Sequence, residues 1–195
     1  MDGRPRPSPA ERRARRAAVD DPEEVLAAAL RRLEVRAFSV AGLRRRLVDA
    51  GYRADLVERA LERLVGLGLL DDAAYARDWI EGRDRSRPRG SAALRRELAQ
   101  RGVEPEVIAA ALAERASRAG GEGPPADADE RTADPDERAA AALLARRAAP
   151  LARVADPRLR RQRAFALLAR SGFDPDVCAA VVGAWLAAEE AGRAR

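Results

Sequence analysis

Arginine is the residue type in this sequence that is best suited to chemistry with a partner. All 37 basic residues of the 195 are arginine, and they outnumber the acids in segments 4–16, 31–53, 83–101 and 153–170. A guanidinium forms paired hydrogen bonds with a phosphate or a carboxylate, so clustered arginines can bind a polyanion. A solvated helix face in a chain that uses arginine in place of lysine has the same composition, and charge alone leaves both interpretations open.

The residue types that usually carry catalysis are scarce. The chain has no histidine and no lysine, which removes the commonest general base, every Ser–His or Cys–His pair and every histidine metal site. The single cysteine, Cys178, excludes an internal disulfide, and its apolar surroundings predict a buried side chain. Asp71 and Asp72 could bind a metal ion as a pair, but their place at a predicted helix start favours capping. We therefore expect no catalytic site, no metal and no cofactor.

The composition favours helices that must position these arginines. Hydrophobic residues make up 47% of the chain but aromatic residues only 4%, and runs typical of strands are scarce. No apolar stretch approaches the roughly 20 residues that span a bilayer, and the basic, Pro-rich beginning lacks the apolar core of a signal peptide. We expect an all-α protein in the cytoplasm, without a membrane partner.

An internal repeat indicates the architecture. Segment 43–52 (LRRRLVDAGY) matches segment 94–103 (LRRELAQRGV) at an offset of 51 residues, and a third copy is centred on Gly172. In each copy a helix ends at glycine, the residue best suited to the left-handed position that follows a helix. A short turn then starts the next helix, at Glu104-Pro105 in the second copy and Asp174-Pro175 in the third.

One further helix precedes each pair, so the sequence predicts three tandem three-helix units in an elongated array. Tyr75 and Trp79, four residues apart in one of these helices, could stack on bases, but this spacing is more typical of a buried face. The predicted divisions are a disordered basic arm at 1–20, units at 21–70, 71–118 and 136–190, a flexible acidic linker rich in Gly and Pro at 119–135, and a tail at 191–195.

The densest motif lies within the second unit. It begins as GLLDDAAYARDWI at Gly68, continues through a basic loop that ends in RPRG at Gly90, and resumes as LRRELAQRGV at Leu94. This order closely resembles the middle unit of the RecX family, regulators of the RecA recombinase. The resemblance spans about residues 22–188 when the three-unit plan is counted, although Ala164 stands where the repeat predicts leucine.

The resemblance implies a regulator without catalytic activity or cofactor. Such a protein binds RecA and its filament on single-stranded DNA, and mostly inhibits recombinase, ATPase and co-protease activity in DNA repair and the SOS response. We expect a monomer that contacts RecA, and DNA directly as a further option, through arginines of the middle helices and the basic loop. These are Arg44, Arg45, Arg46, Arg83, Arg85, Arg87, Arg89, Arg95, Arg96, Arg160, Arg161 and Arg163.

Two other functions fit parts of the sequence. A free-standing, Arg-rich helical DNA-binding protein is the first, because a three-helix unit resembles a helix-turn-helix variant. Against it, the predicted recognition helices offer mainly Arg and Ala instead of the Asn, Gln or Ser that usually read base edges. A carboxylate-dependent nuclease is the second, and loss of activity on chelation would reveal it.

Overall fold

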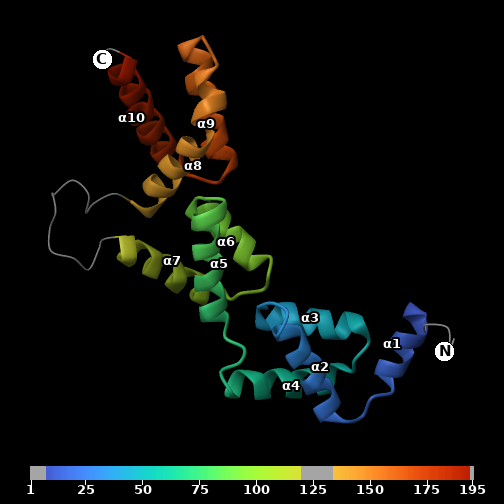
Figure 1. The fold of residues 1–195 in the computed structure, drawn as a ribbon. Helices are drawn as coiled ribbons and strands as arrows, with labels where there is room; N and C mark the ends of the chain where they lie inside the picture. Colours follow the sequence, from blue (N-terminus) through green and yellow to red (C-terminus); the bar gives the residue numbers. More distant parts are fainter. Residues whose placement is uncertain (1–7, 120–133, 194–195) are drawn as a thin grey trace. The chain divides into compact units, whose positions relative to one another are not determined.

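The computed structural model describes residues 8–119 and 134–193 (Figure 1). Over these residues the secondary structure consists of α-helices joined by turns and short loops. The all-α class predicted from the sequence is confirmed. The helices are α1 Pro9–Ala17, α2 Pro22–Leu33, α3 Val40–Ala50, α4 Ala54–Gly66, α5 Asp72–Ser86, α6 Ser91–Ala99, α7 Pro105–Ala119, α8 Pro135–Ala152, α9 Pro157–Arg170 and α10 Pro175–Arg193.

The helix starts follow the capping signals in the sequence. Asp156 accepts a hydrogen bond of 2.8 Å from the backbone N–H of Arg158, and Pro157 occupies the first position of α9. Asp71 accepts bonds from the backbone N–H groups of Ala73 and Ala74 at 2.8 and 3.2 Å. The prediction that Asp71 caps a helix is thus confirmed.

The repeated glycines end or follow the middle helices of the repeats, as predicted. Gly51, Gly102 and Gly172 have φ angles of 108°, 77° and 83°, in the left-handed region that other residues rarely adopt. Each of these turns leads directly into the next helix, which folds back along the one before it. The repeat in the sequence is therefore a repeat of helix, left-handed turn and helix.

The chain divides into two compact parts, each with its own core. The first part contains the residues up to Tyr75 together with Arg101–Val103, and in it α4 packs against both α2 and α3. Its apolar cluster includes Val25, Leu43 and Leu47, which have no exposed surface. Small alanines let the helices of this core approach closely, in keeping with the scarcity of aromatic side chains.

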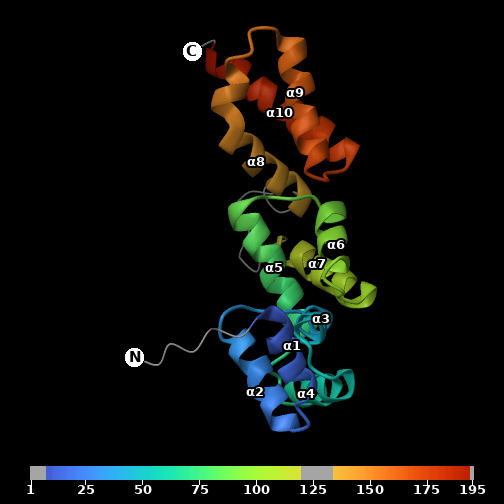
Figure 2. The ribbon, with the colours of Figure 1, turned by 90° about the vertical axis from the view of Figure 1, so that its right-hand side faces the viewer.

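The second part contains Ala76–Gln100 and the residues from Glu104 onward. Within it α6 packs on α7, while α8, α9 and α10 all pack on one another, as Figure 2 shows. Leu168 and Cys178 lie in the core of the last three helices with no exposed surface. The prediction that Cys178 is a buried apolar side chain is confirmed.

The beginning of the chain differs from the prediction. Residues 1–20 were expected to form a disordered arm, but 9–17 form helix α1. A capping box explains its start, because Ser8 accepts from the N–H of Glu11 and Glu11 accepts from the N–H of Ser8. The hydrogen bonds from Ser8 also lower the pKa of Glu11. Residues 1–7 lie outside the described part of the chain.

Two further expectations need comment. The predicted linker at 119–135 lies outside the described residues over 120–133, while α7 extends to Ala119 and α8 begins at Pro135. Helix α10 continues to Arg193, so most of the predicted tail is helical. Tyr75 and Trp79, expected in the core, are only half-buried, because the small Ala76 and the aliphatic Ile80 occupy the core face of α5 instead.

Candidate partner-binding surface

The arginines expected to contact a partner fall into three groups by burial. Arg83 and Arg89 are half-buried and Arg160 is buried. The others are exposed: Arg44, Arg45, Arg46, Arg85, Arg87, Arg95, Arg96, Arg161 and Arg163. Arg44, Arg45 and Arg46 belong to the first compact part and the remainder to the second.

The three arginines of α3 are not equivalent. Arg44 donates two hydrogen bonds to the carboxylate of Glu58, at 2.7 and 2.9 Å, and these bonds raise the pKa of the guanidinium. Arg45 and Arg46 form no ion pair within the described residues. Because Leu43 and Leu47 fix the buried face of this helix, Arg45 and Arg46 point to solvent and are open to a partner.

The last turn of α5, which leads into the basic loop, is held by an ionic cluster. Glu97 of α6 accepts hydrogen bonds from Arg83 Nε at 2.7 Å and from the indole N–H of Trp79 at 3.0 Å. The guanidinium of Arg83 also lies 4.6 Å from the centre of the Trp79 ring, within range of a cation–π contact. Arg83 and Trp79 therefore hold α5 against α6, which leaves Arg83 poorly placed to bind a partner.

The chain on either side of this loop is anchored through its backbone. Arg146 of α8 donates hydrogen bonds of 2.7 Å to the carbonyls of Arg85 and Ser86. Pro88 is buried, and the N–H of Gly90 donates to the carbonyl of Ser171 at 3.2 Å. The chain is thus held on both sides of the loop, at the end of α5 and at Gly90.

The anchored backbone leaves four arginines exposed on one stretch of chain. Arg85 projects from the last turn of α5, Arg87 from the loop, and Arg95 and Arg96 from α6, whose Leu94 and Leu98 are fully buried. Arg89 lies closer to the protein, with Nε 3.8 Å from the Glu97 carboxylate.

Arg160 does not fit the expectation of a partner contact. It is only 6% exposed and donates to the carbonyl of Val154 through Nε and Nη2, at 3.0 and 2.8 Å. Its Nη1 reaches Glu189 of α10 at 3.1 Å. Arg160 thus closes the α8–α9 turn against α10, and its role is structural.

Helix α9 presents Arg161, which was predicted as a contact, together with neighbours that were not. Arg158, Arg161, Gln162 and Phe165 line a shallow hollow of about 400 Å³ on its outer face. Their spacing of three to four residues places them along one side of the helix. Both Arg158 and Phe165 lie within the arginine segment 153–170, and the helical period counted one turn in each direction from Arg161 and Gln162 would have selected them.

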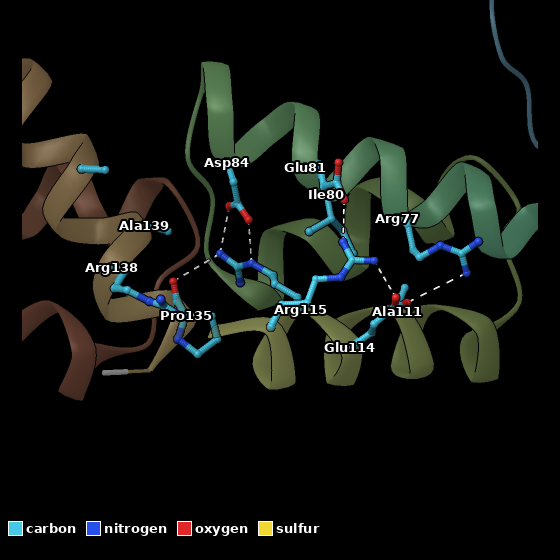
Figure 3. A pocket seen from close by; sticks show the side chains of 12 residues that line it. Arg77, Ile80, Glu81, Asp84, Ala111, Glu114, Arg115, Pro135, Arg138 and Ala139 are labelled. Atoms are coloured by element: carbon cyan, nitrogen blue, oxygen red, sulfur yellow. Dashed lines mark hydrogen bonds and ion pairs between the residues drawn. The ribbon is translucent and has the colours of Figure 1, made fainter. Parts of the chain in front are cut away.

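A second cavity, of about 360 Å³, lies between α5, α7 and α8 (Figure 3). Arg115 is at its centre, with 7% of its side chain exposed, and donates to both carboxylate oxygens of Asp84 at 2.9 and 3.0 Å. Its Nη1 donates to Asp136 at 2.6 Å. Burial lowers the pKa of Arg115, but the hydrogen bonds that it donates to Asp84 and Asp136 outweigh this effect, and the net shift is upward.

Asp136 accepts hydrogen bonds from Ser91 of α6 as well as from Arg115. It accepts hydrogen bonds from the backbone N–H of Ser91 at 2.9 Å and from its hydroxyl at 3.0 Å. One carboxylate therefore caps α6, compensates Arg115 of α7 and begins α8. Arg115 was missed in the sequence, although it follows Ile108 and Ala111 on the apolar face of α7, where a charge signals a buried ion pair.

The rim of this cavity carries paired charges. Arg118 bonds to Glu81 and Glu114, and Arg77 lies 3.9 Å from Glu114, as the dashed lines in Figure 3 show. Arginines and carboxylates therefore pair across the opening, and three of the four lining arginines are bonded to carboxylates. Its arrangement is suited to joining three helices.

The remaining candidates for chemistry are engaged elsewhere. No cluster of His, Cys, Asp or Glu that could bind a metal occurs in the described residues. Asp72, the second member of the acidic pair, accepts a hydrogen bond of 2.8 Å from the backbone N–H of Val40. Burial, followed by the nearby Asp174, raises the pKa of the Cys178 thiol, which disfavours its nucleophilic form. Of the helices described, none is long and apolar enough to cross a bilayer.

Comparison with known proteins gives a consistent result. The family model for the second three-helix domain of RecX matches residues 71–112. The regulatory protein RecX of Mycobacterium ulcerans (strain Agy99) is 35% identical over 167 residues, an alignment that covers 86% of this chain and 87% of the relative. That of Mycolicibacterium smegmatis is 42% identical over 85 residues, which cover 44% and 45% of the two chains.

Solved structures agree in fold. The crystal structure of RecX from Lactobacillus salivarius superposes with a TM-score of 0.62 at 17% identity, over 84% of this chain and 96% of the other. The sequence relation to the protein of Mycobacterium ulcerans extends over most of both chains and thus well beyond the motif of the second unit. The chain belongs to the RecX family of regulatory proteins.

Proposed function

We propose that this protein binds the RecA recombinase and its filament on single-stranded DNA, and that it lowers the filament's recombinase, ATPase and co-protease activity. The observation that carries the proposal is the 35% identity, over 86% of this chain, to a protein named regulatory protein RecX. Regulation of RecA and a place in DNA repair follow from that family.

The exposed arginines support a role in binding. Arg45, Arg46, Arg87, Arg95 and Arg96 reach solvent from helices or an anchored loop, so a partner has to order their side chains but little of the backbone. A guanidinium suits a carboxylate on RecA and a phosphate on DNA equally well. Either target is compatible with regulation of a protein–DNA filament.

Hydrolysis of ATP by RecA on single-stranded DNA tests the proposal. RecA and the DNA are held at fixed concentration and moderate salt while this protein is titrated, and DNA binding by this protein alone is measured in parallel. We expect hydrolysis to fall at protein concentrations well below that of RecA, and below those at which this protein coats the DNA.

The alternative is a free-standing DNA-binding protein, favoured by the net charge of +5 and the arginine clusters. In that case hydrolysis falls only when the protein covers the DNA, and the effect disappears steeply as salt rises. That result would exclude a regulator that acts on RecA. Unchanged hydrolysis at every ratio would exclude it as well.

A further inference from the structure

We propose that the outer face of α9, formed by Arg158, Arg161, Gln162 and Phe165, is a binding site for single-stranded nucleic acid. Phe165 stacks on a base and the arginines bind neighbouring phosphates of the strand. The proposal deepens the proposed function by assigning the site that touches the DNA strand, and it can be tested without RecA.

The first argument is that the surface equivalent to the α9 face is covered in the other two repeats. In α3 and α6 the first turn of the middle helix is covered by a glycine turn from further along the chain. A Cβ atom on Gly102 would lie 2.4 Å from Cβ of Ala41, and one on Gly172 would lie 2.4 Å from Cβ of Ala93. The small side chains on α3 and α6 are what allow the backbone to approach so closely.

The corresponding surface of α9 is open and its chemistry is different. Ten residues before the repeated glycine stand Ala41 in α3 and Ala92 in α6, but Gln162 in α9. The next residue is Gly42, Ala93 and Arg163 respectively. Large polar side chains would prevent a glycine turn from docking, and within the described residues none docks there. The substitution is expected if this surface meets an external partner that carries negative charge.

The second argument is the exposed aromatic ring. Phe165 has 37% of its surface exposed, whereas Phe173, in the same group of helices, is 5% exposed. Arginines of the chain itself lie over Phe38, Tyr52 and Trp79, but in the described residues none lies over Phe165. Part of the ring is therefore available for stacking. Exposure of an apolar ring to water is unfavourable, and a core position would avoid it.

The third argument is charge. Helix α9 contains no Asp or Glu, and neither Arg158 nor Arg161 forms an ion pair in the described residues. Asp156, just before the helix, is occupied with the N–H of Arg158. Two uncompensated guanidinium groups precede the ring by one and two turns along the same side of the helix. Proteins that bind single strands likewise combine stacking with phosphate contacts. A duplex offers phosphates but keeps its base faces stacked, so the ring favours a single strand.

Fluorescence anisotropy with a labelled oligothymidine tests the site. We expect the full chain to bind the single strand more tightly than a duplex of equal length. Phe165→Leu removes the aromatic face but keeps an apolar side chain, and should weaken binding about 10-fold, since stacking on an aromatic contributes roughly that much per base. Phe165→Tyr keeps the ring and should bind as the native chain does. Thermal unfolding of both variants checks that the fold is unchanged.

The arginines are tested through salt dependence. Arg158→Gln with Arg161→Gln should reduce the slope of log affinity against log salt by about 1.4, or about 0.7 for each phosphate contact to a single strand that is lost. Arg147→Gln with Arg153→Gln removes the same charge from exposed positions of the same part and should leave the stacking-dependent preference for the single strand intact. Equal loss from both pairs would overturn the site, as would native binding by Phe165→Leu.

The outcomes separate this inference from the proposed function. If Phe165→Leu relieves inhibition of RecA but leaves oligothymidine binding unchanged, the α9 face binds protein and the inference is wrong while the function stands. If single-strand binding depends on Phe165 but the protein never affects RecA, the inference stands and the function is wrong.

Discussion

At the scale of residues, arginine has two separate roles in this chain. Arg115 and Arg160 are buried, with each guanidinium occupied by carboxylates or backbone carbonyls. The planar group with five donors suits such sites, because one side chain can satisfy several acceptors at once. Exposed arginines such as Arg87 and Arg95 have no such partners among the described residues, and they are the ones available for function.

The buried ion pairs of Arg115 should contribute measurably to stability. Arg115→Ala leaves Asp136 and Asp84 without their cation, and loss of one partner of a buried pair destabilises by about 3 kcal/mol. Arg118, three residues further along α7, also pairs with two carboxylates but is half exposed. Arg118→Ala should therefore cost much less than Arg115→Ala, because solvent screens its ion pairs. Urea unfolding measures both, and equal losses would contradict a special role for Arg115.

Cys178 should react slowly in the native protein. Its side chain is fully buried, and burial raises the pKa of the thiol, so little thiolate exists near neutral pH. Reaction with a thiol-specific reagent at pH 7.5 should be slow in buffer and fast in denaturant. As the pH rises toward the raised pKa the native rate should increase. A native thiol as reactive as the denatured one would show that α10 opens readily.

At the scale of elements, the glycine turns are docking points as well as chain reversals. Gly102 packs on Ala41 and Gly172 on Ala93, while Gly51 packs on Arg13 of α1. Helix α1 thus covers the glycine turn at Gly51, as α3 covers the turn at Gly102 and α6 the turn at Gly172. Repeat proteins commonly end in an atypical unit that covers the last repeat, and α1 fits this role.

Substitution of Gly90 tests how tight the docking is. A Cβ on Gly90 would lie 2.1 Å from the carbonyl oxygen of Gly172, which is backbone and cannot move aside alone. Its φ of −70° suits any residue, so the cost is purely steric. Gly90→Ala should destabilise by about 2 kcal/mol, whereas Gly82→Ala, in α5 with no atom within 4 Å, should stabilise by about 0.5 kcal/mol. Thermal unfolding distinguishes the two signs.

Much of the element structure could be predicted from local signals. The Asp-Pro starts at Asp21 and Asp156 and the glycine ends at Gly51 and Gly172 act within one turn of chain, so sequence alone locates them. Helix α1 was missed because its arginine content was interpreted as disorder, although Ser8 and Glu11 form a recognisable capping box.

The candidate site was less predictable because burial depends on contacts distant in sequence. Arg160 and Arg161 are adjacent and look equivalent in the sequence, yet Arg160 is buried against Glu189 and Arg161 is exposed. Arg83 is likewise removed from the site by Glu97 of the next helix. Charge clusters identify a segment that can bind a polyanion, but which of its members face solvent follows from tertiary packing.

At the scale of the whole molecule, function should depend on the position of charge and not on its sum. The chain carries a net charge of +5, so even a few substitutions change its long-range attraction to DNA. A test of a specific surface must therefore compare variants that have the same net charge.

Replacement of the four exposed arginines around α6 provides this test. Arg85, Arg87, Arg95 and Arg96 changed together to Gln should relieve inhibition of RecA ATP hydrolysis about 10-fold, because an ion pair or phosphate contact is lost at several points. The control changes Arg59, Arg138, Arg147 and Arg153, which are also exposed, and removes the same charge. This control variant loses only long-range electrostatic attraction. Its inhibition of RecA should therefore weaken no more than the inhibition by the native chain weakens when salt is added. If both variants lose inhibition equally, net charge governs the interaction and the α6 surface has no special part in it. If only the first does, the anchored loop and α6 form the surface through which this RecX-family protein acts.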